Sequence, residues 1–132
     1  MANDPDVCPF CDIIDRDETL TATNMGVAFP DAHPVSRGHT LVVPRRHVDD
    51  LFELSAYEFD AIWQLVKDVR KQLEGKHSPD GFNVGVNVGR AAGQTVAHAH
   101  IHVIPRYTGD VDDPRGGIRW LLPDKAKYLE DG

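Results

Sequence analysis

One segment with helical period, set among short strand-like segments, is the feature that most limits the fold of this chain. Apolar residues recur at spacings of three and four from Phe59 to Leu73, which is the period of an amphipathic helix. Ser55 and Glu58 have the spacing of a capping box ahead of it, and Gly75 stands where a helix is expected to stop. The sequence therefore predicts one long helix that ends near residue 75.

The other apolar segments are short and typical of β-strands. They lie near residues 19–23, 27–29, 40–43, 82–88 and 97–104, and turn residues separate them. Because several strands accompany one long helix without regular alternation, the sequence predicts an α+β domain with a mainly antiparallel sheet. Residues 109–132 are rich in charge, Gly and Pro, so we expect an extended tail there.

Charge and hydropathy exclude several classes of partner. The 132 residues suit a single domain, and 21 acidic against 14 basic residues give a net charge of -7. This balance argues against a broad electrostatic grip on nucleic acid or an anionic membrane, so a phosphate ligand would need local donors. No apolar run approaches the roughly 18 residues of a membrane span, and residues 1–6 lack the basic and apolar regions of a signal peptide. We expect a cytoplasmic protein.

Three histidines alternate with apolar residues in the segment 97–104. In a strand, His98, His100 and His102 would share one face, while the residues between them face a core. The usual residues of a polar strand face, Thr, Lys and Glu, are absent from this segment. A neutral imidazole is a nucleophile, and neighbouring imidazoles penalise charging of the central one. The pattern favours a catalytic face over an exposed histidine-bearing strand.

The residues before this segment include candidate phosphate ligands. Glycines at 89 and 93 allow a close backbone approach, and the side chains of Asn87, Gln94 and Thr95 offer donors without net charge. A tight turn between two strands would use the same glycines.

Two cysteines, Cys8 and Cys11, are too few for a secreted disulfide framework. The pair is open to three interpretations: half of a zinc site, a redox centre, or two inert thiols. A redox Cys-Pro-x-Cys motif belongs at the start of a helix after a buried strand, and only seven mostly polar residues precede Cys8.

These segments together resemble the histidine-triad (HIT) family, whose signature is His-x-His-x-His followed by two apolar residues, here residues 98–104. Residues 8–14, 28–31 and 38–47 resemble the other family blocks in the right order. The resemblance covers residues 8–107 as one HIT domain and leaves 108–132 as a tail or flap. It implies a HIT-like fold, with a five-stranded mainly antiparallel sheet, one long helix and a short N-terminal helix.

The resemblance also implies roles for single residues. His100 matches the nucleophile that forms a nucleotidyl-histidine intermediate, and His102 matches the residue that binds the phosphoryl group. The catalytic set is His98, His100, His102 and Gln94. The nucleotide-binding set is Asp31 for the ribose hydroxyls, Asn87 and Thr95 for the phosphate and leaving group, Phe10, Ile13 and Phe29 for the base, and His39, which supports the triad.

The function implied is hydrolysis at the α-phosphate of a nucleoside phosphoramidate or a dinucleoside polyphosphate. The transferase branch of the family carries Gln at the position of His102, so His102 favours hydrolysis over nucleotidyl transfer. A nucleotide-binding regulator without turnover is another alternative. A catalytic metal on the three histidines is a further one, although same-face side chains about 7 Å apart along a strand suit a tetrahedral ion poorly.

The resemblance also implies a metal ion, as in family members with this cysteine pair, and a second copy of the chain as partner. A structural zinc would be held by Cys8, Cys11, His47 and His98, with no position left open for substrate. A homodimer would form through the long helix, which carries Trp63, and an edge of the sheet. Residues 113–120 contain Arg and Trp and would suit a flap near the phosphate site.

Overall fold

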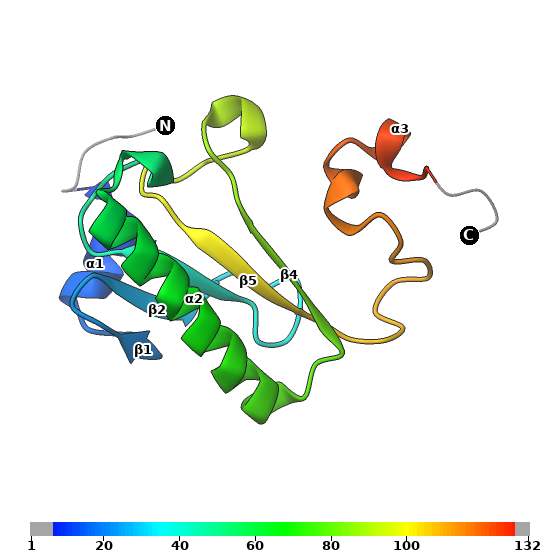
Figure 1. Ribbon diagram of the computed structural model, residues 1–132, viewed down its shortest axis with the longest axis horizontal. Coiled ribbons are helices and arrows are strands. Elements are labelled where there is room, and N and C mark those ends of the chain that lie inside the picture. The colour runs from blue at the N-terminus through cyan, green and yellow to red at the C-terminus, as the bar shows by residue number, and fades with distance from the viewer. Residues whose placement is uncertain (1–6, 129–132) are drawn as a thin grey trace.

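The computed structural model describes residues 7–128 as an antiparallel sheet with one long helix across it (Figure 1). Its strands follow the order β1-β2-β3-β5-β4, and every neighbouring pair is antiparallel. The α+β, HIT-like architecture is thereby confirmed, including the five strands, the long helix and the short N-terminal helix. The elements are α1 (Pro9–Asp15), β1 (Thr21–Ala22), β2 (Gly26–Pro30), β3 (Thr40–Pro44), α2 (Ala56–His77), β4 (Gly81–Val86), β5 (Ile101–Arg106) and α3 (Pro123–Ala126).

Helix α2 begins at the predicted capping box and ends later than predicted. The Ser55 side chain accepts the Glu58 N–H, and the Glu58 carboxylate accepts the Ser55 N–H. The helix continues past Gly75 to His77 because the left-handed residue that closes it is Ser78, with a φ of 50°. The stop predicted at Gly75 was therefore wrong: this glycine lies on an open part of the helix surface.

The apolar side of α2 covers one face of the sheet. Its fully buried members pack against Val42 of β3 and against Ile101 and Val103 of β5. Trp63, which the sequence pattern included in this stripe, lies at its margin with 36% of its surface exposed. The buried residues of α2 are Ile62, Leu65, Val66, Val69 and Leu73.

Helix α1 covers part of the opposite face. Cys8 and Phe10 belong to a second apolar cluster that includes Phe29 and Leu41. Leu41 pairs with His102 across β3 and β5, and paired residues of an antiparallel sheet lie on the same face. His102 therefore projects on the α1 side, while α2 supports the strands from behind.

Strand β5 begins at Ile101, later than the sequence pattern predicts. The backbone N–H of Ala99 donates to the Val48 carbonyl at 2.7 Å, so this residue is bound to the segment that follows β3. Only His102 of the three histidines lies in a strand. The prediction of one strand face for all three was wrong in this respect.

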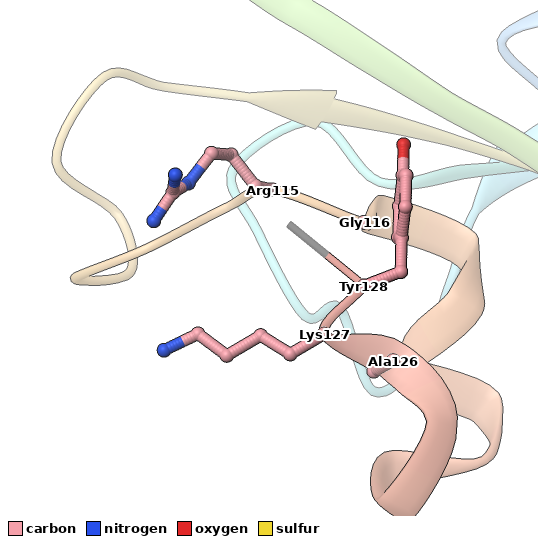
Figure 2. A pocket seen from close by; sticks show the side chains of 5 residues that line it. All are labelled: Arg115, Gly116, Ala126, Lys127 and Tyr128. Carbon is pink, nitrogen blue, oxygen red and sulfur yellow. The ribbon is translucent and has the colours of Figure 1, made fainter. Parts of the chain in front are cut away.

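The C-terminal segment is folded, not extended. It forms a 3-10 turn at Gly117–Leu121 and then α3, whose Ala126 is buried. A cavity of about 10 Å³ beside Arg115, Lys127 and Tyr128 has room for about one water molecule (Figure 2). It is too small for a nucleotide. Residues 129–132 of the predicted tail, and residues 1–6, lie outside the described residues.

Within the described part of the chain, no helix is both long enough and apolar enough to cross a membrane.

Candidate functional site: two histidine clusters around His100

The two cysteines meet two histidines from distant parts of the chain. Cys8 Sγ lies 3.4 Å from His98 Nδ1, and Cys11 Sγ lies 3.3 Å from His47 Nδ1 and 3.5 Å from His98 Nδ1. All four ligand atoms lie within 4.8 Å of one another. Ligand atoms around a tetrahedral zinc ion are separated by roughly 3.3–3.8 Å. Cys8, Cys11, His47 and His98 are therefore positioned to hold a metal ion.

The protonation of His98 fits a metal ligand. Its Nε2 lies 2.7 Å from the Pro44 carbonyl, which can only accept, so Nε2 carries the proton. Burial lowers the pKa of His98 to about 4, and the ring is neutral at pH 7. The Nδ1 lone pair consequently faces the two sulfur atoms.

The two sulfur atoms also fit a cation. Burial and the neighbouring Cys8 raise the pKa of Cys11 to about 12. Two adjacent thiolates repel each other unless a positive charge lies between them, and a divalent cation would supply that charge.

His100 is buried next to this cluster as a neutral imidazole. Its Nδ1 donates to the His98 carbonyl at 2.8 Å, which leaves the lone pair on Nε2. Burial is the main cause that lowers the pKa of His100. The ring of Phe10 packs edge-on against it, with centroids 5.0 Å apart. His100 thus has the protonation state that a nitrogen nucleophile requires.

Asp31, His39 and His102 form a second cluster, in which the His102 ring lies 5.2 Å from the His100 ring between centroids. His39 Nδ1 accepts the Val35 N–H at 3.1 Å, so the His39 proton is on Nε2. That Nε2 lies 2.9 Å from His102 Nδ1 and 3.4 Å from Asp31 Oδ2. His39 therefore donates to His102 Nδ1, and the proton of His102 is placed on its Nε2.

Burial keeps both rings of the second cluster neutral. It is the main cause that lowers the pKa of His102 to about 4, with His100 adding to the effect. The pKa of His39 is also lowered by burial, against an opposing effect of the Asp31 carboxylate. His102 can then act as a neutral Nε2–H donor.

Asp31, His39 and His102 also have the residue types of a cation site, with ligand atoms close together. A cation on His39 Nε2 would require the proton on Nδ1, where the Val35 N–H already points. Two donors would then face each other. The cluster is better described as a hydrogen-bond chain.

The predicted base-pocket residues lie together. The rings of Phe10 and Phe29 are tilted by 60° to each other with centroids 5.4 Å apart, and Ile13 packs against the same cluster. Asp31 stands at the end of β2, where its Oδ1 accepts the His33 N–H at 2.8 Å. A cavity of about 320 Å³ is bordered by Asp31 and His39, but its opposite wall is the C-terminal part of α2, and none of the three predicted base-pocket residues lines it.

The predicted phosphate ligands differ from one another in burial and in hydrogen bonding. Gln94 is 4% exposed, and its amide accepts the Gly89 N–H and donates to the carbonyls of Asp49 and Val96. These bonds hold the loop between β4 and β5 in place, so the role that the structure gives Gln94 is to stabilise this loop. Thr95 is exposed and Asn87 is half-buried in the same loop. Their contacts with a phosphate stay predictions.

The sequence did not predict the backbone groups that determine which nitrogen of each imidazole ring carries the proton. The Pro44 carbonyl, the His98 carbonyl and the Val35 N–H each fix one imidazole, and a backbone group has no residue-type signal.

Comparison with known proteins places this geometry in a family. The HIT domain matches residues 15–109. The adenosine 5'-monophosphoramidase hnt1 of Schizosaccharomyces pombe is 40% identical over 129 aligned positions, and the alignment covers 92% of each chain. The bifunctional bis(5'-adenosyl)-triphosphatase/adenylylsulfatase FHIT of Arabidopsis thaliana is 36% identical over 89% of this chain and 64% of its own. A zinc-bound histidine-triad protein from Mycobacterium smegmatis superposes with a TM-score of 0.73 and 30% identity, over 93% of this chain and 96% of its own.

Proposed function

The chain belongs to the HIT family, and we propose that it hydrolyses nucleotides at the α-phosphate through an adduct on His100. Relatives named a nucleoside phosphoramidase and a dinucleoside triphosphatase support a phosphoramidate or a dinucleoside polyphosphate as the substrate. The observation that carries the proposal is the neutral His100 ring, whose Nδ1–H is held by a carbonyl and whose Nε2 lone pair is free.

The reaction has two steps. His100 Nε2 attacks the α-phosphorus, the bond to the leaving group breaks, and the ring becomes positively charged. The His98 carbonyl, which accepts the Nδ1–H, stabilises that charge. His102 Nε2–H donates to the phosphoryl group, where negative charge develops. Water then attacks the phosphorus, releases the nucleoside monophosphate and regenerates His100.

Binding uses few positive charges. Asp31 accepts from the ribose hydroxyls, and Phe10, Ile13 and Phe29 contact the base. Asn87, Gln94 and Thr95 lie in the loop that approaches the phosphate, and their uncharged donors suit a chain with a net charge of -7.

The ion at the cysteines is zinc in this proposal. Two thiolates and two imidazoles are a donor set that zinc prefers, and four protein ligands leave no place for a water molecule. Its role is structural. A metal-assisted reaction at the three histidines is not supported, because His98 faces the sulfur atoms while His39 donates to His102.

The C-terminal segment is a flap on a domain of residues 8–107. Gly85 pairs with His102, so both face the same side of the sheet. A Cβ at Gly85 would lie 3.9 Å from Ile118 Cδ1. The part of this segment around Ile118 therefore reaches the sheet on the side of the candidate site.

We also propose a homodimer in which β4 and α2 face the partner. β4 is an edge strand of the sheet, and Val84 on it and Trp63 on α2 are each 36% exposed. Light scattering is expected to give twice the 14.7 kDa mass of one chain. A monomer at micromolar concentration would contradict the proposal. A cytoplasmic location stays a prediction.

A turnover panel tests the activity. Adenosine and guanosine phosphoramidates, dinucleoside polyphosphates and adenylyl sulfate are incubated with the chain, and the monophosphate product is quantified by chromatography. Release of a nucleoside monophosphate from at least one class supports the proposal. Tight binding without release would favour a regulator, and a product that appears only with an added acceptor phosphate would favour a nucleotidyltransferase.

A further inference from the structure

The cysteine pair connects helix α1 to the proposed nucleophile. Cys8 caps the helix and Cys11 lies in its first turn. Between them, Phe10 packs against both His98 and His100, with ring centroids 6.0 and 5.0 Å apart. Any change at the two sulfur atoms therefore acts on the helix that covers His100.

The second connection runs through His98. Its ring faces both sulfur atoms, and its backbone carbonyl accepts the His100 Nδ1–H. The ligand residues come from α1, from the segment after β3 and from the segment before β5. An ion at this site would bind three segments together, two of which contact His100.

We propose that Cys8 and Cys11 form a redox modification site: oxidation by a peroxide converts the pair to a disulfide, releases the metal ion and loosens α1 from His100. The inference goes beyond nucleotide hydrolysis, and it rests on the proposed function only in naming His100 as the reacting group.

The arrangement of the two sulfur atoms suits this reaction. Cys11 is half-buried while Cys8 is buried, so an oxidant in solution meets Cys11 first. The Cys11 N–H lies 3.3 Å from Cys8 Sγ, and both sulfur atoms contact the same nitrogen of His98. The chain has no third cysteine that would compete for the intermediate. Cys8 is therefore the resolving thiolate.

The chemistry balances with hydrogen peroxide as the oxidant. The Cys11 thiolate attacks one peroxide oxygen, the O–O bond breaks, and a sulfenic acid and hydroxide form. The Cys8 thiolate then attacks the sulfenic sulfur, forms the S–S bond and releases a second hydroxide. Two protons convert the hydroxides to water, and the two sulfur atoms together lose two electrons. A disulfide has no anionic sulfur left to hold the ion.

The test uses the full chain loaded with zinc. Hydrogen peroxide is added in steps, released zinc is measured with a chelating dye, and the disulfide is located by peptide mass spectrometry after alkylation. Hydrogen exchange of residues 9–15 reports on α1. We expect one zinc ion released per disulfide formed and exchange in α1 at least tenfold faster, with both changes reversed by dithiothreitol and zinc.

Two variants sharpen the result. Cys11→Ser removes the pair and a metal ligand, so α1 should exchange fast from the start and show no further change with peroxide. His39→Asn alters the hydrogen-bond chain and should release zinc as the natural chain does. The proposal is overturned if the disulfide forms with zinc retained, if zinc leaves without a change in α1, or if the sulfurs oxidise separately. None of these readouts needs turnover, so they decide the inference even where no substrate is cleaved.

Discussion

The two clusters beside His100 contain similar residues but differ in where their protons lie. In the cluster of Cys8, Cys11, His47 and His98, the Pro44 carbonyl accepts the His98 Nε2–H, which leaves the Nδ1 lone pair facing the sulfur atoms. In the cluster of Asp31, His39 and His102, the Val35 N–H donates to His39 Nδ1, so the proton of His39 is on Nε2 and points to His102.

This comparison shows that the backbone partner of an imidazole decides its use. A carbonyl partner leaves a ring with a free lone pair, which can bind a cation at His98 or attack phosphorus at His100, and an N–H partner leaves a ring with a proton to donate. Substitutions that change one cluster at a time separate these roles.

Loss of a sulfur ligand should have the largest effect. Cys8→Ser is expected to lose the bound ion and several kcal/mol of unfolding free energy, because the binding energy of a structural ion is folding energy. The melting temperature should then fall by about 10 °C or more. Elemental analysis and a thermal melt measure both quantities.

His39→Asn is the matched control, since it alters only the second cluster and should keep one ion per chain. A Cys8→Ser chain that retains its ion or its melting temperature would break the distinction between the clusters.

The His39 donor should matter less for stability than for turnover. His39→Leu removes the Nε2–H, so His102 is no longer held as an Nε2–H donor, and kcat is expected to fall about a hundredfold. His39→Gln keeps an N–H near the same place and should recover part of the loss. Steady-state kinetics on both variants, with metal content measured in parallel, separate this from a folding defect. Equal activity of Leu and Gln at residue 39 would contradict a donor role.

The second cluster should also make stability depend on pH. His102 has a pKa of about 4 in the folded chain and about 6.5 when unfolded, so the unfolded state takes up a proton first as the pH falls. Stability is therefore highest above pH 6.5 and is lost toward pH 4, by about 2 kcal/mol at pH 5. Urea unfolding at pH 7, 6 and 5 measures this, and His102→Asn should flatten the dependence.

His33→Asn changes an exposed histidine and should leave the pH dependence as it is. Because both variants keep the sulfur cluster, loss of the ion in acid cancels from the comparison. An unchanged slope in His102→Asn would show that the ring is not neutral in the folded chain.

Sequence patterns predicted the parts that depend on residue type and spacing. The capping box at Ser55 and the α+β class follow from local chemistry and period, and the cysteine pair suggested half a metal site. The other half, His47 and His98, came from the family resemblance, because ligands 36 and 87 residues away from Cys11 have no local spacing.

The remaining features depend on tertiary contacts that no local pattern contains. Strand β5 starts late because Ala99 is bound to Val48, and α2 passes Gly75 because Ser78 adopts the left-handed conformation. The protons on His39 and His98 depend on backbone groups that the fold brings to them. These groups are invisible in an amino-acid sequence.

The most direct test of the account is to locate the covalent intermediate. A reaction with excess substrate is quenched and kept alkaline, because phosphohistidine is labile in acid, and peptide mass spectrometry locates the added nucleoside monophosphate. We predict an adduct on His100 alone. In His100→Ala the adduct should be absent and turnover should fall by several orders of magnitude, while nucleotide binding changes little. An adduct on His98, His102 or another residue, or full activity in His100→Ala, would contradict the assignment.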